Sequence, residues 1–208
     1  MMEKIAKRLT AYIIGKGIVA ESEEKIYLYG FQMGLELVSN LIVSILIAIK
    51  MDMLPQATIF FIVFIPIRSY AGGFHFDQYL HCFILSVVTY VGVLELSQIL
   101  TITGEIQIIA DIVLLLLVRY LFPVQNVHRI IDEDEKHYFS KKLQWILAAV
   151  FALVIVLFFL KKERLLAVVS LTLVLIVVSM IAGKIKYFIC KSRQMVNEDI
   201  GSNEMEQK

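Results

Sequence analysis

The sequence lacks the features of several common protein classes. It has two cysteines, Cys82 and Cys190, which are too few for the disulfide framework of a small secreted domain. Its net charge is +1, so the total charge gives no reason to expect a nucleic-acid partner. No uninterrupted apolar core occurs in residues 1–17, and we therefore expect no cleaved signal peptide. The His-Glu-x-x-His and Gly-x-Ser-x-Gly patterns of familiar hydrolases are also absent.

Apolar residues, in contrast, are abundant. They make up 59% of the chain, and the mean hydropathy is +0.76. Soluble domains are about half apolar, and their apolar residues are patterned rather than continuous. Here the runs are long enough to cross a bilayer, which takes about 20 residues per helix. Because backbone exposed to lipid must satisfy its own hydrogen bonds, open sheets are excluded. The sequence predicts an all-α integral membrane protein.

We expect six transmembrane helices preceded by an amphipathic helix. The predicted spans are residues 35–49, 53–67, 79–100, 106–122, 145–160 and 165–181. This gives three parts, an amphipathic interfacial helix over 1–20, a six-helix transmembrane domain over 21–183, and a basic and polar cytoplasmic tail over 184–208. No sequence repeat relates the two halves of the transmembrane part.

The interfacial helix is predicted from its two faces. Apolar residues that include Ile5, Leu9 and Tyr12 fall on one face, whereas Lys4 and Lys7 lie largely on another. This pattern is typical of a helix in the headgroup layer with its basic side toward anionic lipid.

Three local signals suggest where other elements begin and end. Ser22 is a candidate N-cap for the helix that contains the first span. Pro66 lacks an amide N–H and should loosen the end of the second span near residue 67. The charge run over 132–137 is typical of a solvated loop.

The distribution of basic residues predicts the orientation. One side of the six-span arrangement carries Lys4, Lys7, Arg8, Lys16, Lys25, Arg68, Arg129, Lys136, Lys141, Lys142, Lys184, Lys186, Lys191, Arg193 and Lys208, and the other carries Lys50, Lys161, Lys162 and Arg164. The positive-inside rule therefore places both termini in the cytoplasm, together with the segment that contains Cys82. That compartment is reducing, so a free thiol can persist there.

Residues 68–82 interrupt the apolar runs with several groups that do chemistry. Cys82 is a candidate nucleophile and His75 a candidate base for its thiol proton. On one continuous helix, residues seven apart would lie about 10 Å apart along the axis, too far for a hydrogen bond. The pair therefore requires a break in the backbone, and Gly72 and Gly73 have the conformational freedom to provide one.

Other interpretations of this segment remain open. Cysteine and histidine at a membrane boundary are commonly packing residues, and a metal site from His75, Asp77, His81 and Cys82 lacks a familiar zinc-ligand spacing. His81 is a poorer base than His75, because on a helix it points about 100° away from its neighbour Cys82.

Charges in or near the spans suggest another class of protein. Glu36, Glu95, Asp111 and Arg119 would suit a small transporter or export channel for a peptide. A lipid-modifying enzyme is a weaker alternative, because the sequence has no carboxylate-rich metal motif.

The run Arg68-x-x-x-Gly72-Gly73-x-His75-x6-Cys82 resembles the signature of the accessory gene regulator B family. Members are membrane cysteine endopeptidases of bacterial quorum sensing. The basic N-terminal helix, the Glu-rich step into Tyr29-Gly30, the proline after the fourth span and the overall length extend the resemblance over nearly the whole chain.

The resemblance implies a site and a reaction. Cys82 would attack the scissile carbonyl with His75 as its base, and Arg68, Gly72 and Gly73 would bind substrate or support the site. The acyl-thioester formed would then be displaced within the peptide, giving a thiolactone or lactone. No cofactor and no metal are expected.

The resemblance also implies partners and a location. The expected partners are a short membrane-associated propeptide (AgrD-like) and the lipid bilayer, with a homodimer left open and no nucleic acid. The expected location is the cell membrane, with the active site at its cytoplasmic face. Arg68 could hold an acidic part of the propeptide by its charge.

Overall fold

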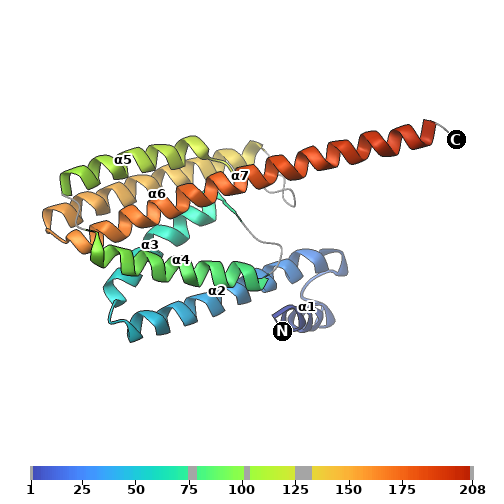
Figure 1. The fold of residues 1–208 in the computed structure, drawn as a ribbon. Helices are drawn as coiled ribbons and strands as arrows, with labels where there is room; N and C mark the ends of the chain where they lie inside the picture. Colours follow the sequence, from blue (N-terminus) through green and yellow to red (C-terminus); the bar gives the residue numbers. More distant parts are fainter. Residues whose placement is uncertain (1, 75–78, 101–103, 125–132, 207–208) are drawn as a thin grey trace. The chain divides into compact units, whose positions relative to one another are not determined.

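The structure, a computed structural model, describes residues 2–74, 79–100, 104–124 and 133–206 (Figure 1). In these ranges the chain is helical and has no strand. The elements are α1 (Met2–Gly15), the 3-10 turn η1 (Glu21–Glu23), α2 (Glu24–Lys50), α3 (Leu54–Ala71), α4 (Tyr79–Ile99), α5 (Gly104–Leu121), α6 (Glu133–Phe159) and α7 (Glu163–Glu206). The prediction of an all-α protein is confirmed.

Five helical stretches of the described chain are long and apolar enough to cross a membrane. They are Glu21–Lys50, Leu54–Ala71, Leu80–Ile99, Glu133–Phe159 and Glu163–Ser192. The fourth predicted span corresponds to α5, which is 18 residues long but contains Glu105, Asp111 and Arg119. Because of these three charges, α5 is not among the five apolar stretches. A membrane span at α5, which would bring the total to six, therefore stays a prediction.

Pro66 does not end α3, and the expectation of a helix end near residue 67 is wrong. The helix continues through Pro66 to Ala71. A proline removes one donor from a helix, and membrane helices tolerate this where nearby groups satisfy the freed carbonyl groups.

The prediction of a loop over 132–137 is also wrong from Glu133 onward, because α6 begins there. Glu133, Asp134 and Glu135 occupy its first turn, where negative charge is favoured by the positive end of the helix dipole. The Lys136 ammonium lies 3.1 Å from the Glu133 carboxylate. Charge at this position therefore starts a helix instead of ending one.

Two further helix ends differ from expectation. Ser22 lies within η1, and α2 begins at Glu24 without a side-chain cap. The last predicted span ends near residue 181, whereas α7 continues without a break to Glu206. Helix formation thus extends beyond the apolar part of the last span.

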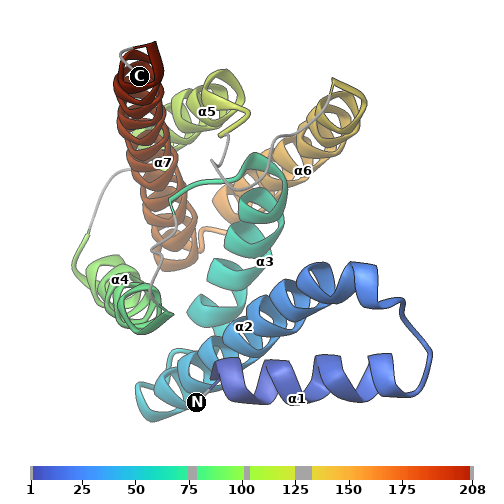
Figure 2. The same ribbon diagram turned by 90° about the vertical axis from the view of Figure 1, so that its right-hand side faces the viewer.

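The chain forms two compact units, and each is described by itself. The first comprises Met1–Leu54 and Phe76–Val91. Within it, α1 packs on α2 as a helical hairpin (Figure 2). Ala6 and Thr10 are buried on α1, whereas Tyr12 is 62% exposed. The small residues Ala6 and Thr10 thus lie on the packed face of α1. Its exposed apolar side chains remain available for the contact with lipid that the sequence predicts.

The same unit joins α2 to the first half of α4. The hydroxyl of Tyr90 donates a 3.1 Å hydrogen bond to the carbonyl of Ser44, and both residues are buried. A buried phenol needs such a partner, because an unpaired hydroxyl in apolar surroundings is costly.

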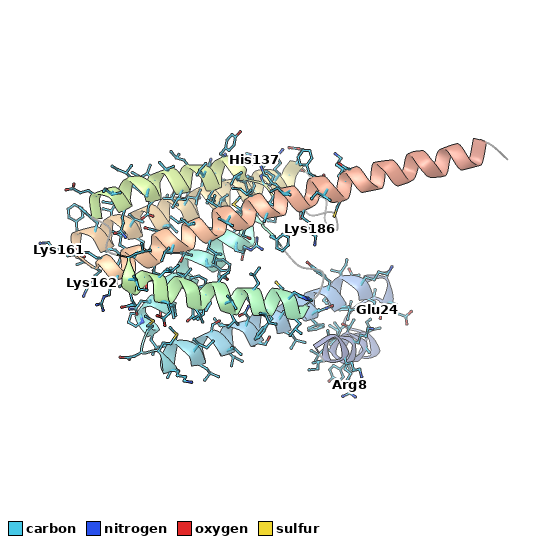
Figure 3. All side chains as sticks on the ribbon, in the orientation of Figure 1. Arg8, Glu24, His137, Lys161, Lys162 and Lys186 are labelled. Atoms are coloured by element: carbon cyan, nitrogen blue, oxygen red, sulfur yellow. The ribbon has the colours of Figure 1, made fainter. Side chains whose placement is uncertain are left out.

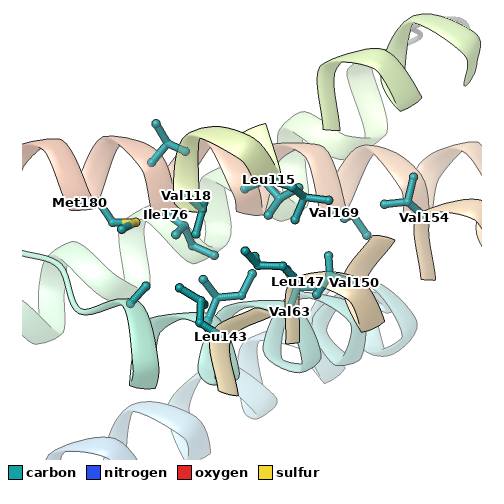
Figure 4. Packing of buried hydrophobic residues seen from close by; sticks show 14 of the residues in the cluster. Val63, Leu115, Val118, Leu143, Leu147, Val150, Val154, Val169, Ile176 and Met180 are labelled. Atoms are coloured by element: carbon teal, nitrogen blue, oxygen red, sulfur yellow. The ribbon is translucent and has the colours of Figure 1, made fainter. Parts of the chain in front are cut away.

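The second unit comprises Pro55–His75 and Gly92–Lys208. Its core lies between α3, α5, α6 and α7, and Figure 4 shows side chains from these helices meeting along α7. The core residues are Val63, Ile67, Ala71, Leu115, Val118, Val124, Leu143, Leu147, Val150, Val154, Leu157, Leu166, Val169, Leu173, Ile176, Val177 and Met180. Lys161 and Lys162 lie at one end of the α6–α7 pair, and His137 and Lys186 lie toward the other (Figure 3).

We predict that neighbouring leucines of α5 differ sharply in their effect on stability. Leu115 is 7% exposed in the core, and Leu116 is 64% exposed. Leu115→Ala should leave a cavity and lower the free energy of unfolding by about 2–5 kcal/mol. Leu116→Ala removes the same atoms from a surface that lipid can refill, so its effect should be much smaller. Thermal unfolding of both variants in detergent tests this, and equal melting temperatures would contradict the packing of α5.

Candidate functional site

The candidate site starts where α3 ends. The amide of Gly72 donates a 3.2 Å hydrogen bond to the Arg68 carbonyl and closes the last turn. The chain leaves the helix at Gly72, which has a φ angle of 78°, and at Gly73, which has a φ angle of 149°. Side chains other than glycine rarely adopt these conformations. Residues 72–74 are therefore not helical, whereas the stretch between His75 and α4, in which the proposed pair needs its break, lies outside the described residues.

The chain that follows α5 packs against this break. The Val124 amide donates a 3.2 Å hydrogen bond to the carbonyl of Ala71, the last residue of α3. A Cβ added to Gly72 would lie 2.8 Å from the Val124 carbonyl oxygen, closer than real contacts allow. The peptide bond between Phe122 and Pro123 is cis. Glycine therefore suits position 72 for two reasons. It accepts the positive φ angle, and it leaves room for the close approach of Val124.

The side chain of Arg68 extends past the two glycines to Phe74. Its Nη2 donates a hydrogen bond to the carbonyl of Phe74, and a Cβ on Gly73 would overlap its guanidinium group. The absence of a side chain at Gly73 thus makes the space that Arg68 fills. The guanidinium of Arg68 has a partner on its own chain, six residues away.

Residues of α7 complete this arrangement, and sequence reasoning missed them. The Phe74 amide donates to the Ser179 carbonyl at 3.0 Å and to the Ser179 hydroxyl at 3.3 Å. The Lys186 ammonium lies 5.7 Å from the centre of the Phe74 ring. One available signal was Gly183, a glycine inside an otherwise continuous helical pattern, since an isolated glycine of this kind can indicate close packing.

Cys82 is the fourth residue of α4 and is half-buried. It lies in the first turn of the helix, where the helix dipole favours negative charge. His75 and Asp77 lie outside the described residues, so the distance between the proposed base and nucleophile stays a prediction. The structure brings together Arg68, Gly72 and Gly73, while Cys82 belongs to the other unit.

In the described chain, no group of three or more His, Cys, Asp and Glu side chains is placed to hold a metal ion. Two members of the four-residue set considered for a metal, His75 and Asp77, lie outside that part. Cys190, on α7, is half-buried and has a free thiol like Cys82.

Comparison with known proteins gives the family. A family model described as "Accessory gene regulator B" matches residues 3–189. The match runs from the second residue of α1 into α7, of which it covers residues 163–189, and it includes the segment from Arg68 to Cys82. Comparisons with curated proteins and with solved structures gave no match.

We predict that Arg68→Lys destabilises the protein although it keeps the positive charge. Lysine lacks the planar fork of arginine and cannot reproduce its geometry at the Phe74 carbonyl. The loss should be about 1.5–3 kcal/mol, the usual size for a hydrogen bond to a charged group. Arg164→Lys, at an exposed position, is the matched control. Unfolding in detergent at matched ionic strength measures both, and equal stability would show that the bond to Phe74 contributes little.

Proposed function

Because the chain belongs to the accessory gene regulator B family of peptide-processing membrane proteins in quorum sensing, we propose that it is a cysteine endopeptidase. Its substrate is a short membrane-associated propeptide, which it cleaves ahead of the C-terminal part. The released peptide is cyclised to a thiolactone or lactone. His75 and Cys82 are the residues that carry the reaction.

The first step forms a bond between the enzyme and the peptide. The Cys82 sulfur attacks the scissile carbonyl as a thiolate, and His75 takes the thiol proton. The C–N bond then breaks, and the leaving amine takes up a proton from His75. The product is an acyl-thioester on Cys82 and a free C-terminal fragment.

The second step releases the peptide as a ring. A thiol or hydroxyl within the bound peptide gives its proton to His75 and attacks the thioester carbonyl, and the Cys82 sulfur leaves as the thiolate. The thioester keeps most of the reactivity of the acyl group, so this exchange needs no nucleotide. Water must be kept from the thioester, and a site at the membrane surface would help to do so.

One structural observation carries the proposal beyond family membership. The chain breaks at residues 72–74, between α3 and α4, immediately before His75. A hydrogen bond between residues 75 and 82 requires that no continuous helix carries both, because such a helix would hold them about 10 Å apart along its axis. The end of α3 at Ala71 supports the proposal to the extent that α3 does not run on as one helix into α4. The place of Cys82 in the first turn of α4 also suits an anionic sulfur.

The proposed location is the cell membrane, with both termini and the site on the cytoplasmic side. The support is the excess of lysine and arginine on one side of the predicted spans. In the second unit, Lys161 and Lys162 lie at the end of the α6–α7 pair away from Lys186 (Figure 3). That end of the pair is the one proposed to face outward.

The transporter alternative predicts charged residues along a path. Asp111 is fully buried in the second unit, with the Ser170 hydroxyl of α7 as a polar neighbour. Glu95, in contrast, is exposed on α4. A transporter would keep its function in Cys82→Ser, whereas the proposed peptidase would not.

We predict that Cys82→Ala and His75→Ala each abolish propeptide cleavage. Removing a nucleophile or its base typically lowers the rate by at least about 10³-fold. The measurement is co-expression with the short peptide encoded beside the gene, followed by mass spectrometry of the product.

Cys190→Ala is the matched control, because it removes the other half-buried thiol. It should cleave at the rate of the unchanged protein. All three variants should reach the membrane in equal amounts, as measured by blotting. Cleavage that survives in Cys82→Ala would refute the proposed chemistry.

A further inference from the structure

We infer that α7 positions the proposed catalytic base, through a docking surface formed by Ser179, Gly183 and Lys186. The three residues are spaced by four and three positions, so they share one face of the helix. That face holds Phe74, the residue immediately before His75. The inference rests on the proposed function and adds positioning residues to it.

The first element of the surface is the hydrogen bond from the Phe74 amide. It reaches the Ser179 carbonyl at 3.0 Å, with the Ser179 hydroxyl 3.3 Å away as a second acceptor. In an α-helix the Ser179 carbonyl is normally the acceptor for the amide four residues on, and its second lone pair remains for another donor. The Phe74 amide donates to this second lone pair.

The second element is the absence of a side chain at Gly183, which is buried. A Cβ at this position would lie 2.8 Å from the Gly73 carbonyl carbon and 3.0 Å from the Phe74 nitrogen. Both are backbone atoms, which cannot swing aside as the end of a flexible side chain can. Gly183 thus lets the backbone of residues 73–74 approach α7 closely enough to reach the Ser179 carbonyl.

The third element is the contact of Lys186 with the Phe74 side chain. The ammonium lies 5.7 Å from the ring centre, within the range of a cation–π interaction. Ser179 therefore holds the backbone of Phe74, and Lys186 holds its side chain.

Hydrogen bonds on both sides of Phe74 restrain the orientation of its backbone, which continues into His75. The Phe74 amide is bound to α7, and the Phe74 carbonyl accepts from Arg68. A peptide unit is planar, so orienting its carbonyl orients the whole unit. Catalytic rates are sensitive to such placement, and a shift of about 1 Å can cost about 10²-fold. The docking surface on α7 accordingly acts on Phe74, the residue to which His75 is joined.

The test compares Gly183→Ala with Gly92→Ala. Both replace a glycine within a helix, but a Cβ at Gly92 would have nothing within 4 Å. Gly183→Ala should lower kcat for cleavage by about 10- to 100-fold, as expected for a misplaced base. Its KM should change by less than about threefold, since a catalytic step rather than binding is lost. Gly92→Ala should match the unchanged protein.

A second readout separates positioning from general damage. In a Cys190→Ala background, the initial rate at which a thiol reagent labels Cys82 is measured against pH, and His75→Ala is included. Gly183→Ala should give the profile of His75→Ala, and Gly92→Ala that of the unchanged protein. If His75→Ala itself leaves the profile unchanged, the proposed dyad fails. If His75→Ala alters the profile and Gly183→Ala does not, the dyad stands and the positioning role is overturned.

If Gly183→Ala fails to reach the membrane, a comparison of Lys186→Ala with Lys184→Ala tests the positioning role of α7. Both remove one positive charge from neighbouring half-buried positions of α7. Lys186→Ala should lower kcat about two- to fivefold, the effect of losing one cation–π contact, and Lys184→Ala should not. Equal rates in the two variants would overturn the inference.

Discussion

A backbone that leaves a helix within a membrane protein must find new hydrogen-bond partners, and the candidate site is organised by that constraint. Three of the groups freed where α3 ends are satisfied by other parts of the chain. The Ala71 carbonyl accepts from Val124, and the Phe74 amide donates to Ser179. The Phe74 carbonyl accepts from the Arg68 side chain. Residues 72–74 are therefore an irregular segment held on three sides, by the end of α3, the chain after α5, and α7.

The glycines of this segment and of α7 have related roles. Gly72 and Gly73 adopt the positive φ angles, and their missing side chains admit Val124 and Arg68. Gly183 lies within α7, and its missing side chain admits the backbone of residues 73–74. A loop positions a reactive group best when a rigid scaffold holds the loop. In the proposed peptidase that group is the imidazole of His75.

The errors of the sequence prediction have a common physical origin. Pro66 and the acidic run at residues 133–137 were assessed by local preference, and both lie inside helices. Each preference is worth only a few kcal/mol, and tertiary packing of an apolar face outweighs it. Both helices have such a face, with Val63 and Ile67 on α3 and Leu143 on α6 fully buried in one core.

The sequence by itself determined that the chain is an all-α membrane protein, because long apolar runs leave the backbone no other way to satisfy its hydrogen bonds in lipid. It also identified the residues of the proposed site, since Gly72, Gly73, His75 and Cys82 form a recognisable local spacing. Only the tertiary structure decided what holds this segment. Ser179 and Gly183 lie more than a hundred positions from Phe74 in sequence, and neither periodicity nor composition relates them to it. Contacts between distant segments depend on how the helices pack, and packing is set by the whole core rather than by any one stretch of residues.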